Sequence, residues 1–211
     1  SHQTPVYPSP RPEDVQDAVK LIKEAKSPMI YFGIGAKDAA EELKEASEKF
    51  KMPLVSSFLA KGIIPDDYPA YLGSTGRVAP KPGAEIGFST DLILWVGTNG
   101  PFSVFLFNKH AKVIQIDIES EKLGKRRHND VSMLADSKAA LKAILAAGED
   151  RQPSDFYEAA IADKKNWNDW QDSFKDSDEK PVRPEPIFDV LNKTASDKAV
   201  YAVDVGNVDI N

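Results

Sequence analysis

The sequence contains no cysteine, and this absence excludes several kinds of chemistry at once. Without thiols the chain can form no disulfide framework, no thiolate metal site and no cysteine nucleophile. Histidine is also scarce, since only His2, His110 and His128 occur and they lie far apart in the sequence. A histidine-based metal centre is therefore not expected, and we predict no metal site in this chain.

Long apolar runs and an excess of basic residues are missing as well. No run approaches the length of a membrane span, and the N-terminus lacks the pattern of a signal peptide. The 27 Lys and Arg residues against 33 Asp and Glu residues give a net charge of -6, which disfavours non-specific attraction to nucleic acid or to anionic membranes. We expect a cytoplasmic protein with no nucleic-acid partner and no membrane span.

What the sequence does contain is an alternation of short apolar runs and helical patterns. A helix is expected at 13–26 and a strand at 29–32, followed by a second helix at 39–50 and a strand at 52–57. This spacing predicts a βαβ unit, whose two strands are parallel and whose crossover is right-handed.

The alternation continues to about residue 147. We expect strands at 68–73, 91–97, 112–118 and 131–135, with a short or irregular helix within 80–90 and a helix at 137–147 that Asp136 or Ser137 caps. The run at 91–97 is almost continuously apolar, as in a central strand buried on both faces. Together these elements predict an α/β fold, a doubly wound, mostly parallel, six-stranded Rossmann-like sheet with helices on both faces.

The two ends of the chain have a different character. Residues 1–12 contain four prolines and predict an extended strap, whereas 151–184 predict a charge-rich helix and a polar linker. Residues 185–211 then predict one helix and one strand, at 199–204, which cannot build a sheet by themselves. We therefore divide the chain into a strap (1–12), a central domain (13–150), a helix and linker (151–184) and the start of a truncated further domain (185–211).

Small and polar residues stand at nearly every expected strand end. In open parallel sheets ligands bind beyond these carboxyl ends, where backbone N–H groups converge. The residues there are Gly33, Ile34 and Gly35, then Ser56 and Ser57, Gly73, Ser74 and Thr75 with Arg77, Gly97, Thr98, Asn99 and Gly100, and finally Asp117. This pattern favours a phosphate-bearing nucleotide, with a cation for the phosphate and a carboxylate for ribose hydroxyls.

Simpler explanations of these residues stay open. Turns of α/β proteins are generally rich in Gly, Ser, Asn and Asp, and a tight turn needs glycine for steric reasons with or without a ligand. An NAD site is disfavoured because Asp38 stands where a third glycine would be, and because no acid closes the second strand. We interpret Trp167 and Trp170 as packing residues and the basic cluster 125–128 as a solvated surface turn. No nucleophile–base pair or acid dyad is visible, so the residues indicate a binding scaffold.

Seven segments occur in an order and spacing that carry a family resemblance: YFGIGA at 31–36, AKGI at 60–63, YPAYLGS at 68–74, RVA at 77–79, QIDI at 115–118, KLGKR at 122–126 and LAD at 134–136. On these segments the sequence resembles the pyruvate oxidases, enzymes of the acetolactate synthase-like superfamily that depend on FAD and thiamine diphosphate. The resemblance runs from residue 4 to residue 206.

The resemblance implies a place for this chain in a three-domain enzyme that forms homo-oligomers. It would be the central, FAD-binding domain with the first helix and strand of the C-terminal domain, and its partners would be the N- and C-terminal domains. The implied FAD contacts are Gly33, Ile34, Gly35, Ser57, Phe58, Gly73, Ser74, Gly97, Thr98, Asn99, Asp117, Ile118 and Asp136. We add Arg77, whose charge makes it a candidate for offsetting the pyrophosphate.

For the full-length protein the resemblance implies oxidative decarboxylation of pyruvate with phosphate and O2, giving acetyl phosphate, CO2 and H2O2. The family's thiamine-activating glutamate belongs to the N-terminal domain, and its Mg2+-placing Gly-Asp-Gly motif would follow Asn211. Gly148-Glu149-Asp150 lacks the second glycine of that motif. Thiamine diphosphate and Mg2+ are thus expected only in the full-length protein, and this chain alone is predicted to be inactive.

Two other functions fit the same resemblance. One is the FAD-carrying domain of an acetolactate synthase-type carboligase, although residues 97–102 look more like the oxidase version. The other is a flavin-free domain that serves assembly in a thiamine-diphosphate-dependent decarboxylase. Binding of flavin would separate the first two functions from the third.

Overall fold

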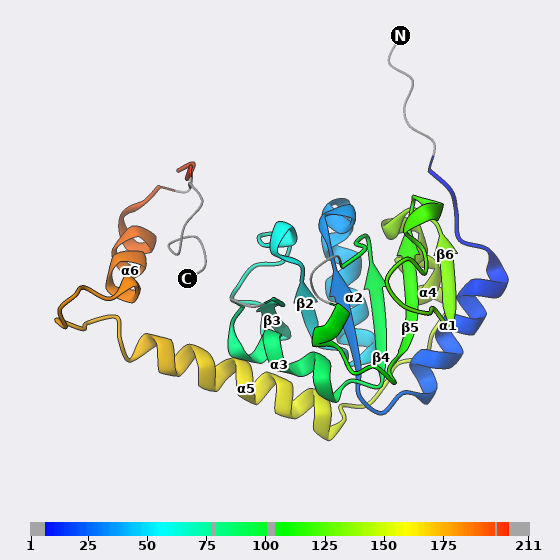
Figure 1. Ribbon diagram of the computed structural model, residues 1–211, viewed down its shortest axis with the longest axis horizontal. Coiled ribbons are helices and arrows are strands. Elements are labelled where there is room, and N and C mark those ends of the chain that lie inside the picture. Colours follow the sequence, from blue (N-terminus) through cyan, green and yellow to red (C-terminus); the bar gives the residue numbers. More distant parts are fainter. Residues whose placement is uncertain (1–6, 77–78, 101–103, 197, 203–211) are drawn as a thin grey trace, which may run out of the picture. The chain divides into compact units, whose positions relative to one another are not determined.

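The computed structural model describes residues 7–76, 79–100, 104–196 and 198–202 (Figure 1). The chain divides into two compact units, Ser1–Lys164 and Lys165–Asn211, and each is described by itself.

The first unit is built on one six-stranded sheet in which every pair of neighbouring strands is parallel (Figure 1). The strand order is β3-β2-β1-β4-β5-β6. The strands are β1 (Pro28–Phe32), β2 (Leu54–Ser56), β3 (Tyr71–Ser74), β4 (Leu92–Val96), β5 (Lys112–Asp117) and β6 (Val131–Leu134). The predicted doubly wound Rossmann-like fold is confirmed.

The two central strands are buried on both faces, as their continuous apolar sequences predict. Side chains along these two strands alternate between two separate core clusters. In β1, Ile30 and Phe32 belong to one cluster, whereas Met29 and Tyr31 belong to the other. The central pair is in direct register, with Tyr31 beside Trp95.

Helices cover both faces of the sheet. Residues of α1 (Pro12–Glu24), α2 (Ala40–Phe50) and α4 (Ser137–Ala147) join the larger cluster. On the other face, Ile86 of α3 (Lys81–Ser89) packs against the second cluster, and Ala160 of α5 (Asp155–Asp172) belongs to it. The residues of α5 up to Lys164 lie in the first unit.

Helix α3 is more regular than its prolines and glycines predict. Pro82 lies in the first turn, where a missing N–H breaks no hydrogen bond. A Cβ at Gly83 would lie 2.4 Å from the carbonyl oxygen of Ser74, and one at Gly87 would lie 2.5 Å from that of Leu106. These glycines therefore allow the helix to approach its neighbours closely instead of breaking it.

Short 3-10 helices follow several strands on the side of the sheet where the strands end, which we call the carboxyl edge. They are η1 (Ile34–Ala39) after β1, η2 (Phe58–Ala60) after β2 and η4 (Ser120–Lys122) after β5. A further short helix, η3 (Val104–Leu106), lies in the connection between β4 and β5. The helix predicted at 39–50 is α2 (Ala40–Phe50), and η1 precedes it. We call the opposite side, where the strands begin, the amino edge.

The second unit contains the rest of α5 and α6 (Pro184–Thr194). The rings of Trp167 and Trp170 lie 5.0 Å apart, and Trp170 lies 5.1 Å from Phe174, whose face the Arg183 guanidinium covers at 3.8 Å. The two tryptophans thus pack against each other and a neighbouring ring. The strand expected at 199–204 is absent from its described residues, 199–202, while 203 and 204 lie outside the described residues. An isolated strand needs a partner, and the described part of this unit offers none.

Candidate functional site

The candidate site lies at the carboxyl edge, beside the two central strands. The chain builds β1, β2 and β3 outward on one side and then crosses over to build β4, β5 and β6 on the other. Strands β1 and β4 therefore flank the topological switch point, where ligands of open parallel sheets bind. The loops after these two strands meet there, since the Gly35 N–H donates to the Gly97 carbonyl oxygen at 3.0 Å.

The glycines of these two loops are required by their mutual packing. A Cβ at Gly33 would lie 2.3 Å from the Cβ of Thr98, and one at Gly35 would lie 2.8 Å from the carbonyl oxygen of Gly97. Gly97 also has a φ of 62°, in the left-handed region. Protein packing alone accounts for these glycines, so they do not by themselves indicate a ligand.

A pair of buried hydroxyl groups joins the last residue of β2, Ser56, to the first residue of β3, Tyr71. The Ser56 Oγ and Tyr71 Oη atoms lie 2.8 Å apart, and burial raises the pKa of Tyr71 to about 12, so the phenol stays protonated. The Ser57 N–H donates to the Phe32 carbonyl oxygen at 2.8 Å, which places Ser57 next to the end of β1. Phe58 follows in η2 and is half exposed.

The end of β3 is shaped by Gly73 and Ser74. Gly73 has a φ of 95° and lies against Pro80, and Ser74 is buried. The predicted cation Arg77 lies outside the described residues.

Asp117 is a buried carboxylate at the end of β5, with only 4% of its surface exposed. Its Oδ1 accepts a hydrogen bond from the Glu119 N–H at 3.0 Å. Burial raises the pKa of Asp117 above its ordinary value, although the backbone N–H of Glu119 and the charge of Lys122 oppose this effect. Ile118 beside it exposes 43% of its surface.

The structural role of Asp136 is sufficient to explain why an aspartate stands at this position. Its Oδ1 accepts from the Ala139 N–H at 2.9 Å, which makes it the N-cap of α4 and decides between the two predicted caps. Its own N–H donates to the Pro8 carbonyl oxygen at 2.9 Å, so it also fastens the N-terminal segment.

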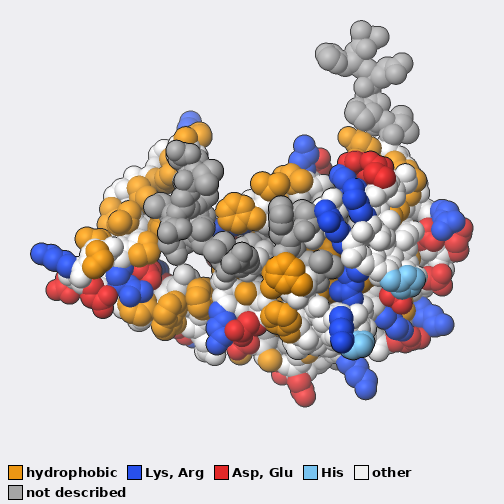
Figure 2. Space-filling view, viewed as in Figure 1, with side chains coloured by type: hydrophobic (Ala, Val, Ile, Leu, Met, Phe, Trp, Pro, Cys, Tyr) orange, Lys and Arg blue, Asp and Glu red, His pale blue; other side chains and the backbone are white. Residues whose placement is uncertain are grey.

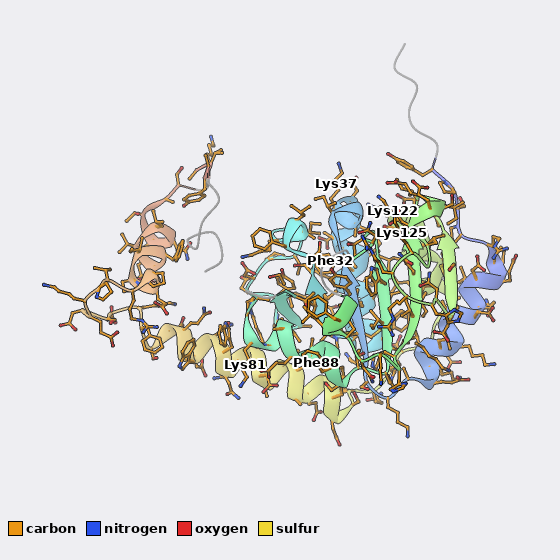
Figure 3. All side chains as sticks on the ribbon, in the orientation of Figure 1. Phe32, Lys37, Lys81, Phe88, Lys122 and Lys125 are labelled. Carbon is orange, nitrogen blue, oxygen red and sulfur yellow. The ribbon has the colours of Figure 1, made fainter. Side chains whose placement is uncertain are left out.

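Three lysines at the same edge were missed as site residues in the sequence. Figure 3 labels Lys37, Lys122 and Lys125 at the upper end of the sheet, where η1 and η4 lie. Figure 2 shows basic side chains gathered over this upper part of the sheet. Lys122 forms an ion pair with Glu119, and this pairing and the nearby Asp117 raise the pKa of Lys122. Their placement at one edge of the sheet depends on the fold, because 85 residues separate Lys37 from Lys122 in the sequence.

The basic cluster at 125–128 is only partly the solvated turn that we predict. Lys125, Arg126 and His128 are exposed. Arg127, however, donates to the carbonyl oxygens of Asn108 at 3.1 Å and Ala111 at 2.7 Å, and its burial lowers its pKa. That prediction is wrong for Arg127, which fastens the loop before β5.

A groove of about 660 Å³ lies elsewhere, at the amino edge. It is formed by the C-terminal half of α2 and the segment after α4, and its lining residues are Glu45, Glu48, Lys49, Lys51, Asp150, Arg151, Gln152 and Pro153. Two of its charged groups, Lys49 and Asp150, form an ion pair at 3.0 Å. The groove does not overlap the residues predicted from the sequence.

The described part of the chain contains neither a metal-binding cluster nor a membrane-spanning helix. Within it, no cluster of three or more His, Cys, Asp or Glu side chains is arranged to hold a metal ion. None of its helices is both long and apolar enough to cross a membrane.

The fold and the carboxyl edge together define an open α/β domain with the architecture of nucleotide-binding proteins. Residues 15–144 match the family described as "Thiamine pyrophosphate enzyme, central domain". The chain belongs to this family, which confirms the predicted superfamily.

Curated relatives are similar to this chain over nearly all its length. It is 40% identical to the pyruvate oxidase of Lactiplantibacillus plantarum, over 100% of this chain and 35% of that protein. It is 32% identical to the putative thiamine pyrophosphate-containing protein YdaP of Bacillus subtilis, over 99% of this chain and 37% of the relative. It is 29% identical to the probable acetolactate synthase large subunit of Methanocaldococcus jannaschii, over 92% and 35%. The chain thus spans about a third of the length of these relatives.

Proposed function

We propose that this chain is the FAD-binding central domain of a pyruvate oxidase. The observation that carries the proposal is the set of groups at the carboxyl edge, where lysines, a buried carboxylate and exposed apolar side chains follow three different strands. The 40% identity to a protein named pyruvate oxidase, over the whole of this chain, supports the same assignment.

The charged groups suit the diphosphate and the ribose of a dinucleotide. Lys37, Lys122 and Lys125 would offset the negative charge of the diphosphate, alongside the backbone of the loops at 33–35 and 97–99. The Asp117 carboxylate would accept hydrogen bonds from ribose hydroxyl groups, each contributing about 1.5–3 kcal/mol in such a shielded position.

The apolar groups suit flat rings. Ile34, Phe58 and Ile118 expose 52%, 46% and 43% of their surfaces at this edge. Large apolar side chains left open beside polar loops are typical of ligand sites, because the ligand covers them when it binds. Within the proposed assignment these side chains would shield the rings of FAD from water.

The residues of this chain bind and orient, and FAD supplies the two-electron redox chemistry when it is bound. We place the thiamine diphosphate, its activating glutamate and Mg2+ on other segments of the full-length protein, which would assemble as a homo-oligomer. The overall reaction we propose for that protein is oxidative decarboxylation of pyruvate, with phosphate and O2, to acetyl phosphate, CO2 and H2O2.

Titration with FAD tests the binding role directly. The purified chain, stripped of any flavin, is titrated with FAD while flavin fluorescence and visible absorbance are recorded. We expect saturable binding of one FAD per chain, which Asp117→Asn weakens and the exposed Asp163→Asn leaves unchanged. Failure of the wild-type chain to bind FAD would overturn the proposal and favour a flavin-free assembly domain.

An acetolactate synthase-type carboligase is the second candidate, because relatives with that name match over most of this chain. Assay of the full-length protein with pyruvate separates the two. A pyruvate oxidase consumes phosphate and releases H2O2, whereas a carboligase forms acetolactate without either. The 211-residue chain alone is expected to produce no H2O2 from pyruvate, and detectable production would contradict the assignment of catalytic groups to other segments.

A further inference from the structure

We infer that Trp95 is a positioning residue for cofactor binding: its indole N–H holds the Thr98 carbonyl group and thereby presents the Asn99 N–H to an acceptor oxygen of the dinucleotide. The inference takes its ligand from the proposed function. The effect of the indole N–H on the loop after β4 can be measured without a ligand.

The indole is itself firmly held. Trp95 lies on β4 and exposes only 2% of its surface. The ring of Tyr31 meets it edge-on at 4.9 Å, and the ring of Phe107 lies 5.3 Å away. A side chain enclosed on several sides has few other rotamers available, so its N–H is a fixed donor.

That donor reaches forward to the loop after β4. The distance from Trp95 Nε1 to the Thr98 carbonyl oxygen is 2.6 Å. The buried Gln115 adds a longer contact of 3.5 Å from its Nε2 to the same oxygen, and its Oε1 accepts from the Gly124 N–H at 2.9 Å. Through Gln115 the loop after β4 is therefore linked to the loop after β5.

The indole also fixes the far end of the loop by contact. A Cβ at Gly100 would lie 2.2 Å from Cζ2 of Trp95, so the backbone of Gly100 rests on the ring. Gly97 and Gly100 have φ values of 62° and 52°. The loop thus turns at both ends through left-handed glycines, with Thr98 and Asn99 between them.

The geometry of the peptide bond then sets the direction of a donor. In a planar trans peptide the C=O and the following N–H point to opposite sides. Because the Thr98 carbonyl is bonded to the indole, the Asn99 N–H points away from Trp95. Among the described residues none accepts a hydrogen bond from this N–H. A backbone donor left over at the switch point matches the need of a phosphate or carbonyl oxygen.

Trp95→Phe is the variant that tests this inference, because it keeps an aromatic ring and removes the N–H. We expect FAD affinity to fall about fivefold, which corresponds to the free energy of one lost neutral hydrogen bond. In the FAD-free chain, hydrogen exchange at the Gly100 amide, which donates to Thr98 Oγ1 at 3.2 Å, should become faster. Trp170→Phe is the matched substitution in the other unit and should change neither quantity.

Ile93→Val controls for a general loosening of the core, because Ile93 belongs to the same cluster as Trp95 and makes no hydrogen bond to the loop. If Ile93→Val lowers the affinity for FAD as much as Trp95→Phe does, the positioning role is overturned. If Trp95→Phe does not fold, Gln115→Met replaces it, with an expected loss of about threefold.

The ligand-free measurement separates the two proposals. Unchanged exchange at the Gly100 amide in Trp95→Phe overturns the positioning role, whether or not FAD binds. Faster exchange with unaltered FAD affinity also overturns it, because the N–H then does not serve the ligand. A wild-type chain that ignores FAD overturns the proposed function and, with it, the ligand named here.

Discussion

The two edges of the sheet contain similar polar residues but use them differently. At the amino edge the Asp91 carboxylate accepts from the backbone N–H groups of Lys26 and Ser27, at 2.7 and 2.9 Å. Arg151 donates to the carbonyl oxygens of Ile22 and Ala25. These side chains replace the hydrogen bonds that the backbone lacks where helices end and strands begin.

At the carboxyl edge the polar groups are only partly engaged in this way. Asp136 caps a helix, but the Asp117 carboxylate has a raised pKa, which indicates that burial outweighs the groups that favour its charge. Apolar side chains such as Ile34 also remain exposed there. Polar groups that the fold does not fully use, next to open apolar surface, are what we expect at the edge that we propose binds the cofactor.

In this molecule the volume of a groove does not indicate where a ligand binds. The groove at the amino edge is large, yet its Lys49 pairs with Asp150 and its Arg151 supports backbone carbonyls. At the carboxyl edge the loops are packed directly against each other. The chemistry of the lining residues separates the two edges, and the volume alone does not.

The largest effect on stability is expected from Gly97→Ala, which tests whether the close packing of the loops after β1 and β4 stabilises the carboxyl edge. The new Cβ would lie 2.6 Å from the carbonyl carbon of Gly35 in a backbone with φ at 62°. Left-handed strain and overpacking together should lower the free energy of unfolding by about 3 kcal/mol. Urea unfolding followed by circular dichroism measures the change.

Gly62→Ala is the control for strain without a clash. Gly62 has a φ of 88°, but a Cβ there meets nothing within 4 Å. We expect a loss of about 1 kcal/mol. Equal losses for the two variants would show that the loops after β1 and β4 can separate easily, contrary to the packing described here.

The sequence predicts the fold well because burial leaves a simple pattern. The continuous apolar run of β4 identifies a buried strand, and the glycines at 33–35 identify the point where β1 ends. The spacing of such strands along the chain then predicts the six-stranded parallel sheet. The short or irregular helix expected within 80–90 is the nine-residue α3, in which Gly83 and Gly87 serve close packing against β3 and η3. A sequence does not distinguish such a glycine from a helix breaker.

The candidate site was less accessible to sequence reasoning. Lys37 and Lys122 are unremarkable in the sequence, and only the parallel sheet brings η1 and η4 to one edge. Conversely, Arg127 looks like a surface cation but holds two backbone carbonyls. Whether a polar residue is free to bind depends on contacts with residues distant in the chain, which local patterns do not contain.

A medium effect on stability alone is expected at the amino edge. Asp91→Ala removes the acceptor of two backbone N–H groups and should lower the free energy of unfolding by about 2 kcal/mol. FAD affinity should not change when both proteins are measured well below their unfolding temperatures. Weaker FAD binding with unchanged stability would mean that the two edges do not divide their roles as described.

The smallest effect on stability, and the one of opposite sign, is expected for Asp117→Asn. Burial raises the pKa of Asp117, so the folded state holds the proton more tightly than the unfolded state does. The stabilisation linked to protonation is complete below the unfolded pKa and is lost as the pH rises through the folded pKa. At neutral pH the ionised carboxylate therefore opposes folding, and asparagine removes this penalty.

Asp117→Asn should accordingly melt at the same temperature as the wild type or higher at pH 7, and this difference should shrink as the pH is lowered toward 4. FAD affinity should fall about tenfold, because asparagine accepts a weaker hydrogen bond from a hydroxyl group than a carboxylate does. Gain of stability with loss of binding is the mark of a residue kept for a ligand. A lower melting temperature at pH 7 with unaltered FAD binding would instead assign Asp117 to the structure, as Asp91 is at the other edge.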